Sequence, residues 1–291
     1  MISGFGSTLP GRNEDKLFNV RGHRVAMATE YEDLDYRTEA GVATITIDRP
    51  SVHNAFTEGT VAELNDSIER FRRDDGAYVA VLTGAGDGFC AGADVSSMPD
   101  WKEKGEDAYG AFLETVQGVV AGLRESSKPT IAAVGGPAIG AGCDFALACD
   151  LRTVGPDAVL REGFVGMGLV PGDGGAWLLP RLIGESKARE YLLTGRDITP
   201  AAAVDLGLAV ERAESALDAA HDLAEELVDL PALAVRHTNR LIDAEQSFEA
   251  HCDRAIDHQW ECVNDPEHEE AVAAFREGRK PRFDREYSHS R

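Results

Sequence analysis

Apolar residues recur with strand-like and helix-like spacing through the first half of the chain. GVATITIDRP (41–50) alternates apolar and polar residues and ends at a proline, which predicts a half-buried strand. AYVAVLTG (77–84) and PTIAAVGG (129–136) are apolar runs that predict two further strands. Helical periodicity over 57–73 and 106–124 predicts the helices between them. Strands that alternate with helices favour parallel pairing, so the fold class is α/β with layered strands and helices.

Polar residues at predicted helix ends add detail to this pattern. Thr60 and Glu63 have the spacing of a capping box at the start of the first helix. Thr199 precedes a proline and a run of alanines, which predicts a later helix that ends at Gly207.

The chain divides into three regions. Residues 1–37 are polar and unpatterned, and we expect them to be an N-terminal extension. Residues 38–213 contain the alternating strands and helices of the core. Residues 214–291 are mostly amphipathic helix, interrupted near Pro231 and Pro266, and this pattern is typical of a lid or an oligomer contact.

The formal net charge is −22, and this acidic balance disfavours two classes of partner. Nucleic acid and anionic membrane surfaces are bound through clustered lysines and arginines, so we expect neither as a partner. The acidic surface fits either a high-salt environment or ordinary solubility, and the sequence leaves these two explanations open.

The cysteines and the chain start bear on metal content and cellular location. The five cysteines are odd in number and contain no CxxC pair, which speaks against a disulfide framework or a cysteine-based zinc site. No apolar run is long enough to span a bilayer, and the first residues lack the apolar segment of a secretory signal. We therefore expect a cytoplasmic protein with reduced thiols.

Three glycine-rich segments follow predicted strands and precede predicted helices. They are GAGDGFCAGADVSSM (84–98), GGPAIGAGCDFALACD (135–150) and GFVGMGLVPGDGG (163–175). Glycines allow sharp turns, and helix N-termini present free N–H groups, so two converging segments can form a donor pair for an oxyanion. None matches a dinucleotide-binding or P-loop fingerprint.

Taken together, five segments resemble the crotonase, or enoyl-CoA hydratase/isomerase, superfamily in order and spacing. They are RPSVHNAF (49–56), FCAGADVSSM (89–98), GPAIGAGCDFALACD (136–150), GLVPGDGGAWLLPRLIG (168–184) and TGRDITPAAAVDLGLAVE (194–211). The resemblance covers about residues 38–285. It implies a crotonase-like spiral of ββα units with a helical C-terminal trimerisation region, hence a homotrimer or a dimer of trimers. It further implies an acyl-CoA thioester as substrate, as in fatty acid metabolism. Because coenzyme A is part of that substrate, no cofactor and no metal are expected.

The resemblance also implies specific binding residues. The backbone amides of Ala91 and Ala141 are expected to form the oxyanion hole for a thioester enolate, where loss of one donor typically costs ~3–4 kcal/mol in barrier. Asp94 has an alternative role as an acid at a helix start. The residues expected to contact the acyl group or coenzyme A are Asn54, Ala55, Gly92, Ala93, Asp94, Gly140 and Phe164.

The expected catalytic acids depart from the family pattern. Hydratases of the superfamily hold a water between two glutamates; here Asp144 stands at the first position and Phe164 at the second. Glu162 lies two residues earlier, a large displacement for a catalytic acid, so we expect a surface carboxylate beside Arg161.

Asp173 is the other acid that can replace the missing glutamate. Its PGDGG turn is similar to the PD-x-GG segment of the ring-opening isomerases of phenylacetyl-CoA degradation, although the acid here lies one residue later. The PGDG placement itself resembles the superfamily's β-diketone hydrolases. The latter rely on active-site histidines, which the second and third segments here lack. Asp173 can alternatively be a turn residue that hydrogen-bonds its own backbone. We name Asp144 and Asp173 as the expected catalytic pair, and the sequence leaves open whether Asp173 or Glu162 acts.

Three functions remain compatible with these residues. The first is an enoyl-CoA hydratase, a lyase that adds water through Asp144 and Asp173. The second is an enoyl-CoA isomerase, for which one carboxylate suffices. The third is an acyl-CoA binder without catalysis. Four apolar residues after the first glycine segment either wall the acyl pocket or pack as ordinary core: Trp101, Tyr109, Phe112 and Leu113.

Overall fold

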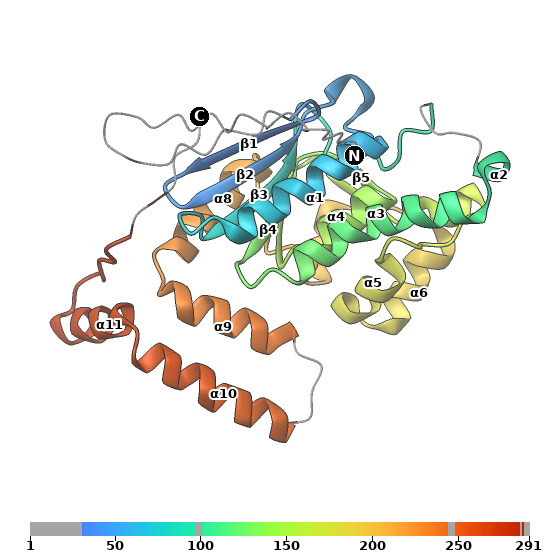
Figure 1. Ribbon diagram of the computed structural model, residues 1–291. Coiled ribbons are helices and arrows are strands. Elements are labelled where there is room, and N and C mark those ends of the chain that lie inside the picture. Colours follow the sequence, from blue (N-terminus) through green and yellow to red (C-terminus); the bar gives the residue numbers. More distant parts are fainter. Residues whose placement is uncertain (1–30, 97–100, 244–247, 286, 288–291) are drawn as a thin grey trace, which may run out of the picture. The chain divides into compact units, whose positions relative to one another are not determined.

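The computed structural model describes residues 31–96, 101–243, 248–285 and 287 (Figure 1). Most of the expected extension, residues 1–30, lies outside the described residues. Its last residues belong to the sheet, because β1 begins at Leu34 rather than after residue 37. Leu34, Tyr36 and Thr38 alternate with more exposed neighbours along this strand, so the core begins earlier than the sequence pattern indicates.

The elements alternate between strands and helices before the chain becomes helical. The strands are β1 Leu34–Glu39, β2 Val42–Ile47, β3 Val79–Gly84, β4 Thr130–Val134, β5 Pro137–Ile139, β6 Leu151–Val154, β7 Val159–Arg161 and β8 Glu211–Arg212. The α-helices are α1 Glu58–Arg73, α2 Trp101–Lys104, α3 Glu106–Arg124, α4 Ala141–Ala148, α5 Gly175–Ile183, α6 Glu185–Thr194, α7 Pro200–Asp205, α8 Ala216–Val228, α9 Ala232–Asp243, α10 Phe248–Val263 and α11 Pro266–Glu277.

The main sheet has six strands in the order β1-β2-β3-β4-β6-β8. Only β1 is antiparallel to its neighbour, and every other pair is parallel, as the alternation of strands and helices predicts (Figure 1). Strands β5 and β7 pair in parallel as a second, two-stranded sheet. The first two glycine-rich segments follow β3 and β4 of the main sheet, and the third follows β7 of the second sheet and leads into α5.

The two faces of the main sheet carry separate cores. Side chains such as Ile45 and Leu82 face the helices α1 and α3. Their strand neighbours, including Val81 and Ile131, face the alanines of α8. This alternation is the period of two that a pleated strand imposes. Helix α8 belongs to the C-terminal region whose pattern is typical of a lid or an oligomer contact, yet it covers one face of the sheet and is part of the core.

Helix α1 begins differently from the expected capping box. Thr57 is the N-cap, and its side chain accepts a hydrogen bond from the Thr60 amide at 3.2 Å. Glu63 instead accepts hydrogen bonds at 2.9 Å from the amides of Glu32 and Asp33. The predicted Thr60–Glu63 capping box is therefore wrong, because the helix starts at Glu58, before Thr60. The Glu63 side chain instead holds the segment that precedes β1.

Other predicted boundaries agree closely with the structure. Thr199 caps α7, and α3 spans the predicted range from 106 to 124. Among the helices described, none combines the length and the apolar character needed to cross a bilayer.

Close packing of α4 on the first glycine segment depends on Gly142. A methyl group at this position would collide with the carbonyl oxygen of Cys90. Backbone atoms cannot move aside as side chains do, so only glycine lets the start of α4 approach this segment.

Gly142→Ala is expected to lower the free energy of unfolding by about 1–3 kcal/mol through this overpacking. Urea denaturation followed by circular dichroism measures the change. The matched control is Gly110→Ala in α3, where the new methyl group has open space and should be neutral or stabilising. Equal stability of Gly142→Ala and the wild-type chain would contradict the packing argument.

Candidate functional site

A cavity of about 940 Å³ lies where the three glycine-rich segments meet. It is mostly apolar, with few polar groups along its wall, as is typical of a site for an apolar ligand. Nine of the residues expected to act at the site line it: Ala55, Ala91, Gly92, Ala93, Asp94, Gly140, Ala141, Phe164 and Asp173. Two expected residues, Asn54 and Asp144, are absent from this lining.

Aromatic side chains from α2 and α3 form one wall of the cavity. Trp101 stacks on Phe112, with ring centroids 4.9 Å apart, and meets the edge of Tyr109 at 5.7 Å. Leu113 lines the same wall. All four residues therefore face the cavity, and Phe112 in addition packs against the main core.

Asn54 supports the site from behind. Its side chain is fully buried and accepts a hydrogen bond from the Arg49 amide at 3.0 Å. It donates to the carbonyl oxygens of Ala85 and Gly88 at 2.9 and 2.7 Å. These bonds use the side chain to join residues 49–56 to the first glycine-rich segment, and the expected contact of Asn54 with coenzyme A stays a prediction.

Asp94 is held at the cavity wall by neighbours. Its carboxylate accepts hydrogen bonds from the Ser96 hydroxyl at 2.6 Å and the Ser96 amide at 3.1 Å. Arg49 lies 3.4 Å away. The hydrogen bond from the Ser96 hydroxyl is the main cause that lowers the pKa of Asp94, with Arg49 contributing. Asp94 is thus an ionised group that positions the loop.

The backbone amides at the cavity wall differ in whether they are already used. The Ala91 N–H donates to the His53 carbonyl oxygen at 3.1 Å, so it is engaged within the fold. Phe56 pairs with the residues on both sides of Ala93, and the Ala93 N–H has no hydrogen-bond acceptor among the described residues. The Ala141 N–H opens α4 and likewise has no acceptor within the described ranges.

Two carboxyl groups are buried together behind the cavity. Asp144, on α4, is fully buried, and Glu162, which follows β7, is 2 % exposed. Both carboxyl groups lie against Gly175 at the start of α5, where a methyl group would collide with both. The expectation that Glu162 is a surface carboxylate is therefore wrong, because Glu162, the residue directly after β7, turns its side chain into the core against Gly175.

Burial and mutual repulsion control the protonation of this pair. Desolvation is the main cause that raises the pKa of Asp144 well above its ordinary value, and the charge of Glu162 adds to it. Desolvation also raises the pKa of Glu162 to about 7. The Gly175 amide faces Asp144 and the Cys143 thiol faces Glu162, and each favours the ionised form of its neighbour. Neither carboxyl group has a hydrogen-bond partner of good geometry among the described residues, so a proton shared between Asp144 and Glu162 is what satisfies them.

Asp173 is the one member of this acidic group that lines the cavity. It is 7 % exposed, and desolvation raises its pKa to about 6. The turn that carries it lies against α3, because Gln117 donates to the Gly172 carbonyl oxygen at 2.8 Å. Gly174, at φ 144°, has a backbone conformation that side-chain-bearing residues rarely adopt. The negative charge of Asp173 helps to raise the pKa of both Asp144 and Glu162.

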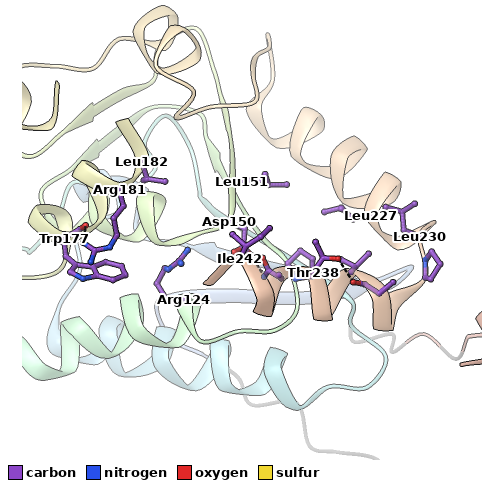
Figure 2. Close-up of a pocket in the computed structure, with 15 residues that line it drawn as sticks. Arg124, Asp150, Leu151, Trp177, Arg181, Leu182, Leu227, Leu230, Thr238 and Ile242 are labelled. Carbon is purple, nitrogen blue, oxygen red and sulfur yellow. Dashed lines mark hydrogen bonds between the residues drawn. The ribbon is translucent and has the colours of Figure 1, made fainter. Parts of the chain in front are cut away.

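A second cavity of about 820 Å³ lies between α9 and the ends of α3 and α5 (Figure 2). Figure 2 shows Trp177 and Arg181 at one end and Leu227 and Leu230 at the other. Its one lining carboxylate, Asp150, is hydrogen-bonded to Thr130 and Asn239. The acids with raised pKa values lie around the first cavity, which is therefore the candidate active site.

Comparison with known proteins places this arrangement in a family. The enoyl-CoA hydratase/isomerase family model matches residues 37–286. A putative enoyl-CoA hydratase/isomerase of Bacillus subtilis, YhaR, is 32 % identical over 257 residues, which cover 87 % of this chain and 99 % of that protein. A crotonyl-CoA hydratase of Syntrophomonas wolfei is 31 % identical over 87 % of this chain and 98 % of its own.

Solved structures agree with this assignment. The crystal structure of a putative enoyl-CoA hydratase from Streptomyces coelicolor superposes with a TM-score of 0.84 at 33 % identity, covering 92 % of this chain and 99 % of that one. The enoyl-CoA hydratase from Bacillus anthracis gives 0.81 at 25 % identity, covering 87 % and 99 %. Since both the sequence motifs and the fold around the cavity match over nearly the whole described core, the chain belongs to the enoyl-CoA hydratase/isomerase family of the crotonase superfamily.

Proposed function

We propose that the protein is an enoyl-CoA hydratase that adds water to a 2-enoyl-CoA through a thioester enolate. The observation that carries this proposal is Asp173, a carboxyl with a pKa of about 6 on the wall of an apolar cavity. Behind it lies the protonated Asp144–Glu162 pair. The hydratase names of the relatives support the same reaction.

The enolate oxygen is stabilised by two backbone amides. We assign these to Ala93 and Ala141, since both line the cavity and neither N–H has an acceptor in the described chain. This assignment replaces the Ala91 amide of the sequence-based expectation, because that N–H is bonded to His53. Donors that are fixed before the reaction stabilise developing charge without reorganisation.

Hydration needs two proton transfers, and we assign each of them to a different acidic group. Asp173 is mainly ionised at pH 7 and acts as the base that deprotonates the attacking water. Asp144, with a pKa raised well above its ordinary value, is the source of the proton for the α-carbon, and since it lies behind the cavity wall a bridging water would carry that proton to the substrate. Glu162 accepts the hydrogen bond of that acid and so sets its orientation. Neighbouring acids whose pKa values are pushed apart are typical of such acid–base pairs.

Enoyl-CoA isomerisation is the second candidate. It is favoured by one specific observation: Asp173 lines the cavity, whereas Asp144 and Glu162 lie behind it. Moving a proton between two carbons of the acyl chain needs a single well-placed carboxylate, which Asp173 alone can provide.

The oligomer is proposed to be a trimer or a dimer of trimers built on the C-terminal helices. Large apolar side chains are exposed on α9, α10 and α11, including Ile242, Ile256, Trp260 and Phe275. Phe275 is 88 % exposed, which is costly for an aromatic side chain unless another subunit covers it.

Asp173→Asn is expected to lower kcat for hydration of a short 2-enoyl-CoA by about 100-fold or more, while acyl-CoA binding is retained. Asp144→Asn should lower it at least about tenfold.

In the wild-type enzyme the rate should rise with pH through about 6 as the base loses its proton. Loss of the absorbance of the conjugated thioester reports hydration, and a gain of absorbance with a 3-enoyl-CoA reports isomerisation.

The control for these variants is Asp157→Asn, an exposed acid remote from the cavity lining. Wild-type rates in Asp173→Asn would remove that residue from the mechanism. Activity only with the 3-enoyl-CoA would overturn hydration in favour of isomerisation, and inactivity with both substrates despite tight binding would indicate a non-catalytic acyl-CoA binder.

In the wild-type chain, titration of Glu162 should lower the free energy of unfolding by about 1–3 kcal/mol between pH 5 and 7.5. Glu162→Gln is expected to remove this change. The pKa of Glu162 is raised from 4.5 to about 7 in the folded state, so the native state binds the extra proton. This stabilisation is present at low pH and is lost as the pH rises through about 7. Glutamine does not titrate, and its amide can donate to Asp144.

Urea unfolding at both pH values measures this effect, with the exposed Glu58→Gln as control. Parallel pH profiles for Glu162→Gln and the wild-type chain would show that Glu162 does not share a proton with Asp144.

Sedimentation velocity of the full chain is expected to give a trimer or a hexamer, because burial of the exposed apolar side chains drives association. Phe275→Glu should shift the distribution toward smaller species. A monomeric wild-type protein at micromolar concentration would contradict the proposed assembly.

A further inference from the structure

Two histidines and a glutamate meet between α9 and α10, away from the candidate active site. His237 lies on α9, and His258 and Glu261 lie three residues apart on α10, a spacing that places them on one face of that helix. Helices α9 and α10 lie side by side (Figure 1). One potential ligand atom from each of the three side chains lies within 4.8 Å of the others.

The two imidazole rings are arranged face to face. Their centroids are 3.9 Å apart with an interplanar angle of 18°, and His237 is only 4 % exposed. The Nε2 atom of His237 lies 2.8 Å from a carboxylate oxygen of Glu261. An imidazole nitrogen binds a metal in the plane of its ring, so the half-buried His258 ring has to turn about its Cβ–Cγ bond before both rings can bind one ion. With that rotation, the three side chains form a compact N, N, O donor set.

Hydrogen bonding leaves this set unsatisfied. Both ring nitrogens of His237 and the Nδ1 atom of His258 are buried without a hydrogen-bond partner among the described residues. The contact of Nε2 with Glu261 at 2.8 Å is an ion-pair contact rather than a hydrogen bond of good geometry, and the Nδ1 atoms of both rings have no partner in the described chain. Leaving such buried polar groups unpaired costs about 1–3 kcal/mol each, so a group that binds them would be stabilising.

Charge at the cluster favours the ligand form of the rings. Two stacked imidazolium ions would repel each other. Neutral imidazole beside a carboxylate is the state in which these residues bind a divalent transition metal.

We propose that His237, His258 and Glu261 bind one Zn²⁺ ion. Two imidazoles and one carboxylate are an established zinc donor set, and water completes the tetrahedron at the exposed side of Glu261. Imidazole nitrogens suit zinc better than magnesium or calcium, which prefer oxygen. The ion links α9 to α10. It takes no part in the acyl-CoA reaction, because none of the three residues lines the cavity of Asp173.

The consequence of this site is structural. Helix α10 packs mainly against α9 and α11. Its side chains Ile256 and Trp260 are largely exposed. A metal link to α9 would fix the orientation of these apolar side chains, which the proposed oligomer requires.

The test is zinc titration of the full-length protein after treatment with a chelator. Isothermal calorimetry with ZnCl₂ is expected to give one site per chain, and elemental analysis should find one zinc per chain after gel filtration. His258→Ala and His237→Ala should each weaken binding by at least about tenfold. His258 is the cleaner position because it is only partly buried, so its replacement disturbs the packing less than that of His237.

Three controls keep the result specific. His268→Ala, on α11 outside the cluster, should bind zinc as the wild-type chain does. The double variant Cys252→Ser, Cys262→Ser should also bind it, which excludes the two thiols of α10 as ligands. Zinc should raise the melting temperature of the wild-type protein and of these controls, but not that of His258→Ala.

Absence of binding, or binding that survives both histidine replacements, would overturn the proposal. Binding abolished by the two cysteine replacements would do the same, since it would assign the metal to the thiols. These outcomes are independent of hydratase activity, so the zinc site and the proposed reaction can fail separately.

Discussion

The burial of Asp144 and Glu162 against Gly175 is the constraint around which the candidate active site is organised. Two carboxyl groups removed from water cannot both be ionised at close range, so they hold a proton between them. Their position requires that α5 begin with a glycine and that α4 present Asp144 in its first turn. The elements that carry the rest of the site are thereby fixed relative to one another.

The same constraint separates two kinds of acid. Asp173 lies on the cavity side of the turn before α5, where it titrates near pH 6, and the carboxyl pair lies on the buried side. An apolar wall that includes Phe164 lines the cavity. By the sequence resemblance, Phe164 stands at the position where hydratases of the superfamily have their second glutamate.

Much of the fold follows from local sequence signals. The strands β2, β3 and β4 and the helix α3 agree with their predicted ranges within a few residues, because apolar periodicity and helix-start residues are local properties. The start of β1 and the cap of α1 differ from their predictions. The Glu63 carboxylate accepts hydrogen bonds from the amides of Glu32 and Asp33, which lie about thirty residues earlier in the chain. A short stretch of sequence therefore cannot contain both partners of these hydrogen bonds.

The sequence by itself determined the α/β class, the three glycine-rich segments and the family, because each depends on residue types at fixed spacing. It also identified nine residues that line the cavity. Only the tertiary structure decided which side chains face the substrate space. Asn54 and Asp144 lie behind the cavity, the Ala91 amide is engaged by His53, and Glu162 is buried beside Asp144. Burial and hydrogen-bond partners are set by segments far apart in the chain, and these also decide which carboxyl group keeps its proton.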